Sequence, residues 1–144
     1  MTADSRALVR RYFNELCNSR NYGAADDLLA ADIRFFGAGV LEPVRGREGF
    51  LDFLKTLYES FPDGTFSLDD DVVEGERAAA SFTFRATHRG DYLGIPATGK
   101  RVTMKGVDLF RIAAGRIEEI RVYSDTASLM IQLGVVDRPE RTGR

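Results

Sequence analysis

A single aspartate interrupts an otherwise apolar strand face. Residues 100–112 alternate in polarity, and the side that carries Asp108 also holds Val102, Met104, Gly106, Phe110 and Ile112. A carboxyl on such a face must be hydrogen-bonded, paired, protonated or in contact with a ligand, because burying it charged and unpaired is costly. Asp108 is therefore the first candidate for acid–base chemistry. Its structural alternative is a carboxyl bonded to Tyr12, to the backbone or to Arg121.

Three more side chains are candidates for holding or moving a proton. Tyr12 could donate a hydrogen bond, and His88 or Asp125 could act as a base. Each has a structural alternative: a core tyrosine, a histidine bonded to the 90–99 loop, and an N-cap for the last helix. His88 and Asp108 lie about six residues apart along the strand direction, which at ~3.3 Å per residue is about 20 Å. They cannot form a dyad, and we expect His88 at the rim and Asp108 deep inside.

Periodicity and turn residues predict the elements that position these groups. Apolar residues at helical spacing predict helices up to about residue 18, at 24–29 and at 46–60, with a short last helix at 126–133. Alternating segments predict strands at 33–36, 65–74, 77–89, 100–112 and 116–124. Helices followed by strands are typical of an α+β fold. We expect a cone, in which a curved antiparallel or mixed sheet of about four to six strands wraps around three N-terminal helices.

The register of the last hairpins decides what faces the aspartate. A hairpin around the 90–99 loop is expected to place Phe82 opposite Asp108. In the next hairpin, a three-residue turn would place Ile120 opposite Asp108, whereas a two-residue turn would place Arg121 there. We favour Ile120, because it suits the apolar face better. The arginine alternative would make the carboxyl part of a structural ion pair.

The two faces of the predicted sheet differ in character. The apolar face and the helices are expected to line a ligand pocket with Phe13, Phe35, Phe53, Phe82, Phe84, Met104, Phe110, Ile120 and Val122. The outer face is basic, with Arg85, Arg89, Arg101, Lys105 and Arg111. Because it lacks interleaved aromatic residues and has acidic residues on a neighbouring strand, we interpret it as a salt-bridged or dimer-forming surface. We expect a homodimer through this outer face.

Composition excludes several classes of function. The 144 residues fit one domain, which we place at 1–136, with a polar and frayed tail at 137–144. A net charge of −2 provides no general attraction for nucleic acid or acidic membranes. One His and one Cys predict no metal site, and the absence of a phosphate loop predicts no nucleotide cofactor. The single Cys17 and the lack of an apolar N-terminal or membrane-spanning run predict a cytoplasmic protein.

Several segments together resemble a known family. They are the loop region 87–101, the strand 107–112, the turn 115–117, Asp125 and the terminal Gln132-Leu133-Gly134. In order and spacing they are similar to the SnoaL-like polyketide cyclases of the nuclear transport factor 2-like superfamily, which includes the ketosteroid isomerases. The resemblance covers nearly the whole chain. It implies the cone fold and a pocket for a hydrophobic small molecule.

The resemblance assigns roles unevenly. Asp108 occupies the position of the cyclases' active-site histidine and of the isomerases' proton-bearing oxyanion-hole aspartate. Tyr12 resembles the isomerases' oxyanion tyrosine. The isomerases' general base, however, falls near Gly37, and the cyclases' acid–base aspartate falls on Val122.

Three functions remain open at this point. The resemblance implies cofactor-independent proton transfer, such as aldol ring closure or isomerisation of a hydrophobic carbonyl compound, which would make the protein a lyase or an isomerase. A non-catalytic binding or assembly module is favoured by the missing bases at positions 37 and 122. An epoxide hydrolase of the same superfamily would need an Asp-Arg-Asp set around one water, which Val122 interrupts unless Asp125 turns inward.

Overall fold

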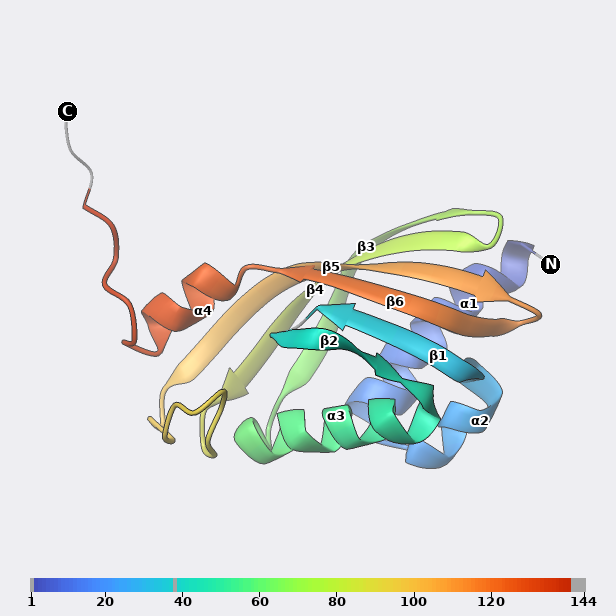
Figure 1. Cartoon of the computed structure of the whole chain (residues 1–144). Coiled ribbons are helices and arrows are strands. Elements are labelled where there is room, and N and C mark those ends of the chain that lie inside the picture. Colours follow the sequence, from blue (N-terminus) through green and yellow to red (C-terminus); the bar gives the residue numbers. More distant parts are fainter. Residues whose placement is uncertain (1, 38, 141–144) are drawn as a thin grey trace.

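Within residues 2–37 and 39–140, which the computed structural model describes, six strands form one mixed sheet (Figure 1). Across the sheet the order is β2 (Val40–Arg45), β1 (Leu29–Gly37), β6 (Arg116–Ser124), β5 (Arg101–Ala113), β4 (Arg77–Thr87) and β3 (Thr65–Glu74). β1 runs parallel to β6, and the other neighbouring pairs are antiparallel. The α+β cone expected from the sequence is confirmed. Residues 141–144 of the expected tail lie outside the described residues.

Helices cover the side of the sheet that becomes the interior (Figure 1). α1 (Thr2–Arg11) continues into a π-helical segment (Tyr12–Asn18), and a 3₁₀ turn (Tyr22–Ala24) precedes α2 (Ala25–Leu28). α3 (Gly46–Ser60) packs beneath β1, with its spaced apolar residues turned inward. α4 (Thr126–Gln132) follows β6 at the far end of the sheet, away from the other helices.

The first two strands differ from the sequence-based expectation. β1 is longer than the predicted 33–36 segment, and β2 was not predicted. Glu42 and Pro43 interrupt the alternation of β2, and both are compatible with its place at the edge of the sheet, where strand polarity and hydrogen bonding are less constrained.

The β4–β5 register differs by two residues from the expected one. Ala80, and not Phe82, lies opposite Asp108, while Phe82 lies opposite Gly106. A side chain at position 106 would not fit, because an added Cβ would lie 2.7 Å from Cζ of Phe82. A shift of two residues keeps every side chain on its original face, so the assignment of Asp108 to the interior is unaffected.

The β5–β6 hairpin follows neither expected register. Its turn has two residues, Ala114 and Gly115, both with positive φ, but the register shifts again between Arg111 and Ile112. This bulge places Val122 opposite Asp108 and sends the neighbouring Arg121 to the outer face. The ion pair that the two-residue turn would have created is therefore not formed.

Candidate functional site

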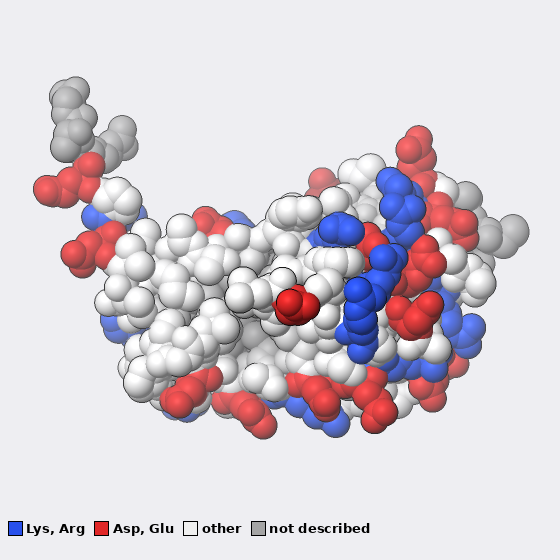
Figure 2. Space-filling model, in the orientation of Figure 1, with Lys and Arg blue, Asp and Glu red and all other residues white. Residues whose placement is uncertain are grey.

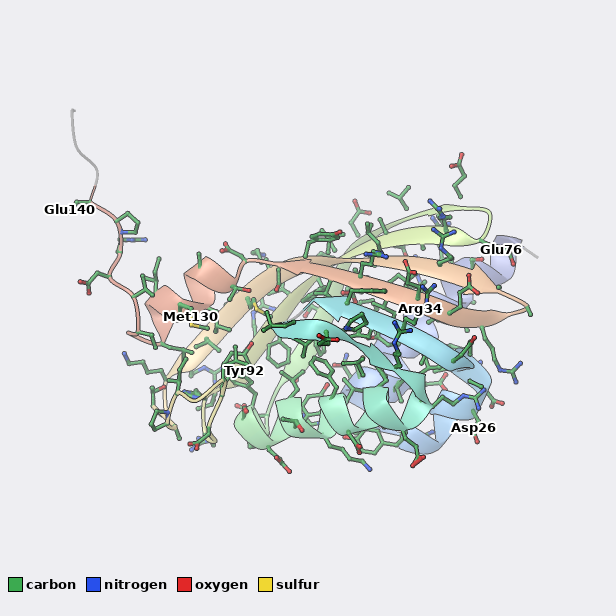
Figure 3. All side chains as sticks on the ribbon, viewed as in Figure 1. Asp26, Arg34, Glu76, Tyr92, Met130 and Glu140 are labelled. Atoms are coloured by element: carbon green, nitrogen blue, oxygen red, sulfur yellow. The ribbon has the colours of Figure 1, made fainter. Side chains whose placement is uncertain are left out.

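A cavity of about 200 Å³ lies between the inner face of the sheet and the helices. Its walls come from the π-helical segment, α3, all strands of the sheet and the loop after β4. The space-filling view shows a hollow in the near face, bordered mainly by uncharged residues (Figure 2). Tyr92, which lines the cavity, comes from the loop after β4. In the view with side chains, Met130 of α4 lies above and to the left of Tyr92 (Figure 3).

Asp108 lines this cavity and is 4% exposed. Its Oδ1 atom is buried and has no hydrogen-bond partner among the described residues. Burial raises the pKa of the carboxyl from 3.8 to about 8, since removal from water disfavours the charged form. At neutral pH the group is therefore mainly a neutral acid, and it can donate a hydrogen bond to a ligand oxygen.

The arginine that could have neutralised this acid lies elsewhere. On the outer face, Nε of Arg121 donates to Glu119 at 2.8 Å, and Arg34 pairs with the same carboxylate at 2.8 Å. The interior carboxyl is thus left without a cation among the described residues that line the cavity. This explains why burial acts on its pKa without an opposing charge.

Tyr12 lines the same wall, and its hydroxyl lies near the thiol of Cys17 and the carboxyl of Asp108. Tyr12 is 4% exposed, and its ring packs edge-on against the ring of Phe110, with 5.4 Å between the two centroids. Burial raises the pKa of the Tyr12 phenol well above its usual value, and the nearby Cys17 and Asp108 add to this effect. Both hydroxyl groups therefore keep their protons at neutral pH, which is the state in which each can stabilise a developing oxyanion.

The other two expected catalytic residues do not line the cavity. His88 is fully buried and not at the rim; its Nδ1 lies 3.0 Å from Oγ1 of Thr98 and accepts the Thr98 backbone N–H at 3.2 Å. Asp125 caps α4 by accepting the backbone N–H of Ser128 at 3.0 Å. In both cases the structural alternative describes the observed contacts, so neither residue is placed to exchange a proton with a ligand in the cavity.

Most of the expected apolar lining does face the cavity. Phe13, Phe35, Phe53, Phe82, Phe84, Met104 and Val122 are lining residues. Phe110 and Ile120 are not, because they pair with each other across β5 and β6 and fill the core behind Asp108. The cavity therefore extends from Asp108 to the loop after β4.

Sequence reasoning missed part of the lining. The additional residues are Val40, Leu54, Thr56, Leu57, Ser60, Phe66, Asp91, Tyr92, Leu93 and Ser124. The α3 residues share a helical face with Phe53, which was a usable signal. The loop residues gave no such signal, since their direction depends on a turn without periodicity.

Neither of the two positions at which the resemblance would place a base carries one. Gly37 has a φ of +107°, and an added Cβ would collide with the carbonyl oxygen of Val122. Val122 lies directly opposite Asp108 and presents an apolar side chain to the cavity. Among the described lining residues there is no Lys, Arg or His, and the second carboxyl group is that of the exposed Asp91.

The described residues contain no group of three or more His, Cys, Asp or Glu side chains arranged to hold a metal ion. None of the described helices combines the length and the apolar character needed to cross a bilayer.

Comparison with known proteins identifies the family. Residues 7–133 match the profile of the SnoaL-like polyketide cyclases. The aklanonic acid methyl ester cyclase DnrD of Streptomyces peucetius is 29% identical over 132 residues, which cover 88% of each chain. The structure of TsrD from Streptomyces laurentii aligns with a TM-score of 0.83 and 29% identity, over 94% of this chain and 98% of TsrD. A candidate SnoaL-like cyclase from Jannaschia sp. CCS1 shares the fold, with a TM-score of 0.85, 23% identity, and coverage of 96% and 95%. The chain therefore belongs to the SnoaL-like polyketide cyclase family.

Proposed function

We propose that the protein binds an uncharged, hydrophobic carbonyl compound and catalyses its cofactor-independent intramolecular aldol ring closure. The observation that carries this proposal is a buried carboxyl, Asp108, which has an unpartnered oxygen at the wall of an apolar cavity. Burial raises the pKa of this carboxyl, which favours its neutral form. The family of the chain supports the same reaction class, since the relative DnrD is named as a cyclase of aklanonic acid methyl ester.

In the proposed reaction, the two hydroxyl groups act on one carbonyl oxygen. Asp108 and Tyr12 donate hydrogen bonds to it, and these bonds strengthen as loss of a neighbouring C–H proton turns the carbonyl into an enolate. The enolate carbon then attacks a second carbonyl carbon of the same molecule, whose oxygen takes up a proton. One carbon–carbon bond forms and the product is an isomer of the substrate.

The charges around the cavity favour a neutral substrate. The described lining residues include no cationic side chain, and the two carboxyl groups are Asp108 and Asp91. A carboxylate ligand would lose its hydration without gaining a counterion, which is unfavourable. Ketones, quinones and esters carry the oxygen that Asp108 can bind without this penalty.

The lack of a basic side chain beside Asp108, within the described residues, favours a second candidate function. No described basic side chain lies beside Asp108, because position 37 is glycine and position 122 is valine. Among the described lining residues, the exposed carboxyl of Asp91 is the remaining candidate acceptor, and it suits a hydrogen whose acidity is increased by two flanking carbonyl groups. For a less acidic substrate the protein would act as a binding module.

Turnover of a defined compound tests the proposal. The compound is aklanonic acid methyl ester, which is named for the relative DnrD, and the readout is a chromatographic peak of unchanged mass. We expect Asp108→Leu to abolish the new peak and Asp108→Asn, which keeps a weaker donor, to reduce it. The control is Asp70→Asn, because Asp70 is an exposed carboxylate on β3. Equal turnover by the wild type and Asp108→Leu would refute the catalytic role. Tight binding without any turnover would favour the binding module.

We also propose that two copies associate through the outer face of the sheet. Leu109 and Tyr123 are exposed there, and Val107 lies opposite Tyr123 between them. Basic side chains on β5 and β4 lie beside this strip and acidic ones on β3 lie beyond them, so a two-fold arrangement can set opposite charges against each other. Light scattering should give a dimer mass for the wild type and a monomer mass for Leu109→Glu. A monomeric wild type would refute the dimer.

A further inference from the structure

The loop between β4 and β5 has a fixed base and a tip that projects over the cavity. At the base, the Ser60 carbonyl accepts the backbone N–H groups of Arg89 at 2.9 Å and Gly90 at 3.1 Å. On the other side, Thr98 is bonded to His88. Between these anchors, the tip is closed by two backbone hydrogen bonds between Tyr92 and Ile95, at 2.9 and 2.8 Å. Asp91 is held as well, because its carbonyl accepts the Ser60 hydroxyl at 2.5 Å. The turn at Leu93 and Gly94 lies beyond these anchors.

The residue at the tip is unusual for its conformation. Leu93 and Gly94 are the two central residues of the turn, with φ of +50° and +81°. Such a turn favours Asn, Asp or Gly at both positions, and leucine is strained there. Leu93 is 58% exposed, so its burial does little to offset the strain. Strain at a position of this kind points to a role for the side chain itself.

The Leu93 side chain reaches across the mouth of the cavity. It both lines the cavity and contacts solvent, which places it at the entrance. On the opposite side is Gly39, which precedes the lining residue Val40, and a Cβ added to Gly39 would lie 3.2 Å from Cδ1 of Leu93. The glycine thus leaves room for the leucine methyl group. Leu93 and Gly39 therefore approach each other over the entrance.

The volume behind this contact is small for a polycyclic ligand. The cavity measures about 200 Å³. A cavity of about 150 Å³ accommodates benzene, and sites for larger ligands span roughly 300–1,000 Å³. With the tip closed, the cavity therefore suits a ligand of one or two rings. A larger ligand requires the tip to move.

We propose that the contact between Leu93 and Gly39 is a clasp that selects ligands by size, which makes Leu93 a specificity-determining residue. This inference deepens the proposed function, since it assumes that the cavity receives a hydrophobic carbonyl ligand. The closed clasp admits compounds of one or two rings freely. It slows the entry of compounds with more fused rings, because they enter only after the contact breaks.

Association rates for ketones of increasing size test the clasp. The probes are 1-indanone, 9-fluorenone and benzanthrone, which are uncharged and differ in their number of rings. Stopped-flow quenching of the protein's tyrosine fluorescence gives the association rates. Leu93→Asn removes the methyl groups and suits the left-handed turn better, so it should fold. Leu93→Ala removes them without adding an amide. The matched control is Leu41→Asn, because Leu41 is fully exposed on β2.

The clasp makes a differential prediction. In both Leu93 variants, we expect association of benzanthrone to accelerate by about tenfold or more, and that of 1-indanone to change by less than about twofold. Equal acceleration of all probes, acceleration by Leu41→Asn, or no acceleration would overturn the clasp. The affinity of Asp108→Asn for 1-indanone tests the proposed function separately, because that small ketone enters with the clasp closed. If no ketone binds, both proposals fail.

Discussion

Replacing Asp108 by asparagine should make the protein more stable while it weakens the chemistry. The substitution keeps the shape of the side chain and removes its ability to ionise. It breaks no hydrogen bond at Oδ1, because that atom has no partner among the described residues. The expected effect on stability is therefore dominated by the proton that the folded protein holds and the unfolded chain releases.

The sign and size follow from the raised pKa of Asp108. Between its usual value of 3.8 and the folded value of about 8, the native state binds a proton that the unfolded state has lost. The free energy of unfolding of the wild type therefore falls as pH rises through this window. At pH 7 the difference is about 3 pKa units, and at ~1.4 kcal/mol per unit it reaches about 4 kcal/mol. Water that enters the cavity solvates the carboxylate and reduces this value, so about 4 kcal/mol is an upper bound.

Urea unfolding followed by circular dichroism measures this difference. We expect Asp108→Asn and the wild type to have similar stability near about pH 4, and the variant to gain up to ~1.4 kcal/mol for each pH unit above it, levelling off near about pH 8. Asp70→Asn is the matched control, since Asp70 is an exposed carboxylate on β3. If Asp108→Asn is less stable at every pH, or if the difference does not change with pH, the carboxyl is not a buried neutral acid.

Three other substitutions have expected outcomes. Val122→Asp places a second carboxyl opposite Asp108, so we expect the rate of isomer formation to rise by about tenfold if the missing base limits it; an unchanged rate would show that it does not. Glu119→Gln should lower the free energy of unfolding by about 1–2 kcal/mol at neutral pH. Desolvation opposes ionisation of Glu119, but the outer-face arginines outweigh it and lower its pKa, so this loss should vanish as pH falls through that lowered value, and a loss that persists in acid would contradict the pairing. Gln132 bonds both backbone groups of Thr103 at 2.8 and 2.7 Å, so Gln132→Ala should lower stability by about 1–2 kcal/mol in thermal unfolding, and an unchanged midpoint would contradict this role.

Alternation and helical spacing were sufficient to predict the fold class and the face on which Asp108 lies. These patterns have periods of two and 3.6 residues, so they report which side of an element is buried. They do not report register along the chain. The bulge after Arg111 and the placement of the Phe82 ring over Gly106 depend on contacts between strands, and both expected pairings were wrong for that reason.

In the candidate site, too, most residues on periodic elements were placed correctly and those that depend on a loop were not. Asp108 and Tyr12 lie on periodic elements and reach the cavity as expected, although their roles await an experiment. His88 follows the last residue of β4, where the ladder continues into the loop through a backbone bond to Lys100. Its burial depends on how that loop folds back. The same holds for Leu93, whose contact with a distant turn cannot be read from local sequence.

The protonation of Asp108 in the free protein is the most direct test of the central claim. With the aspartate carboxyl carbons labelled with ¹³C, the chemical shift of this group can be followed by NMR from about pH 3 to about pH 10 and assigned with Asp108→Asn. We expect it to titrate near pH 8, with the neutral acid present at pH 7. A transition near the ordinary aspartate value of 3.8 would contradict the role of Asp108 as a hydrogen-bond donor.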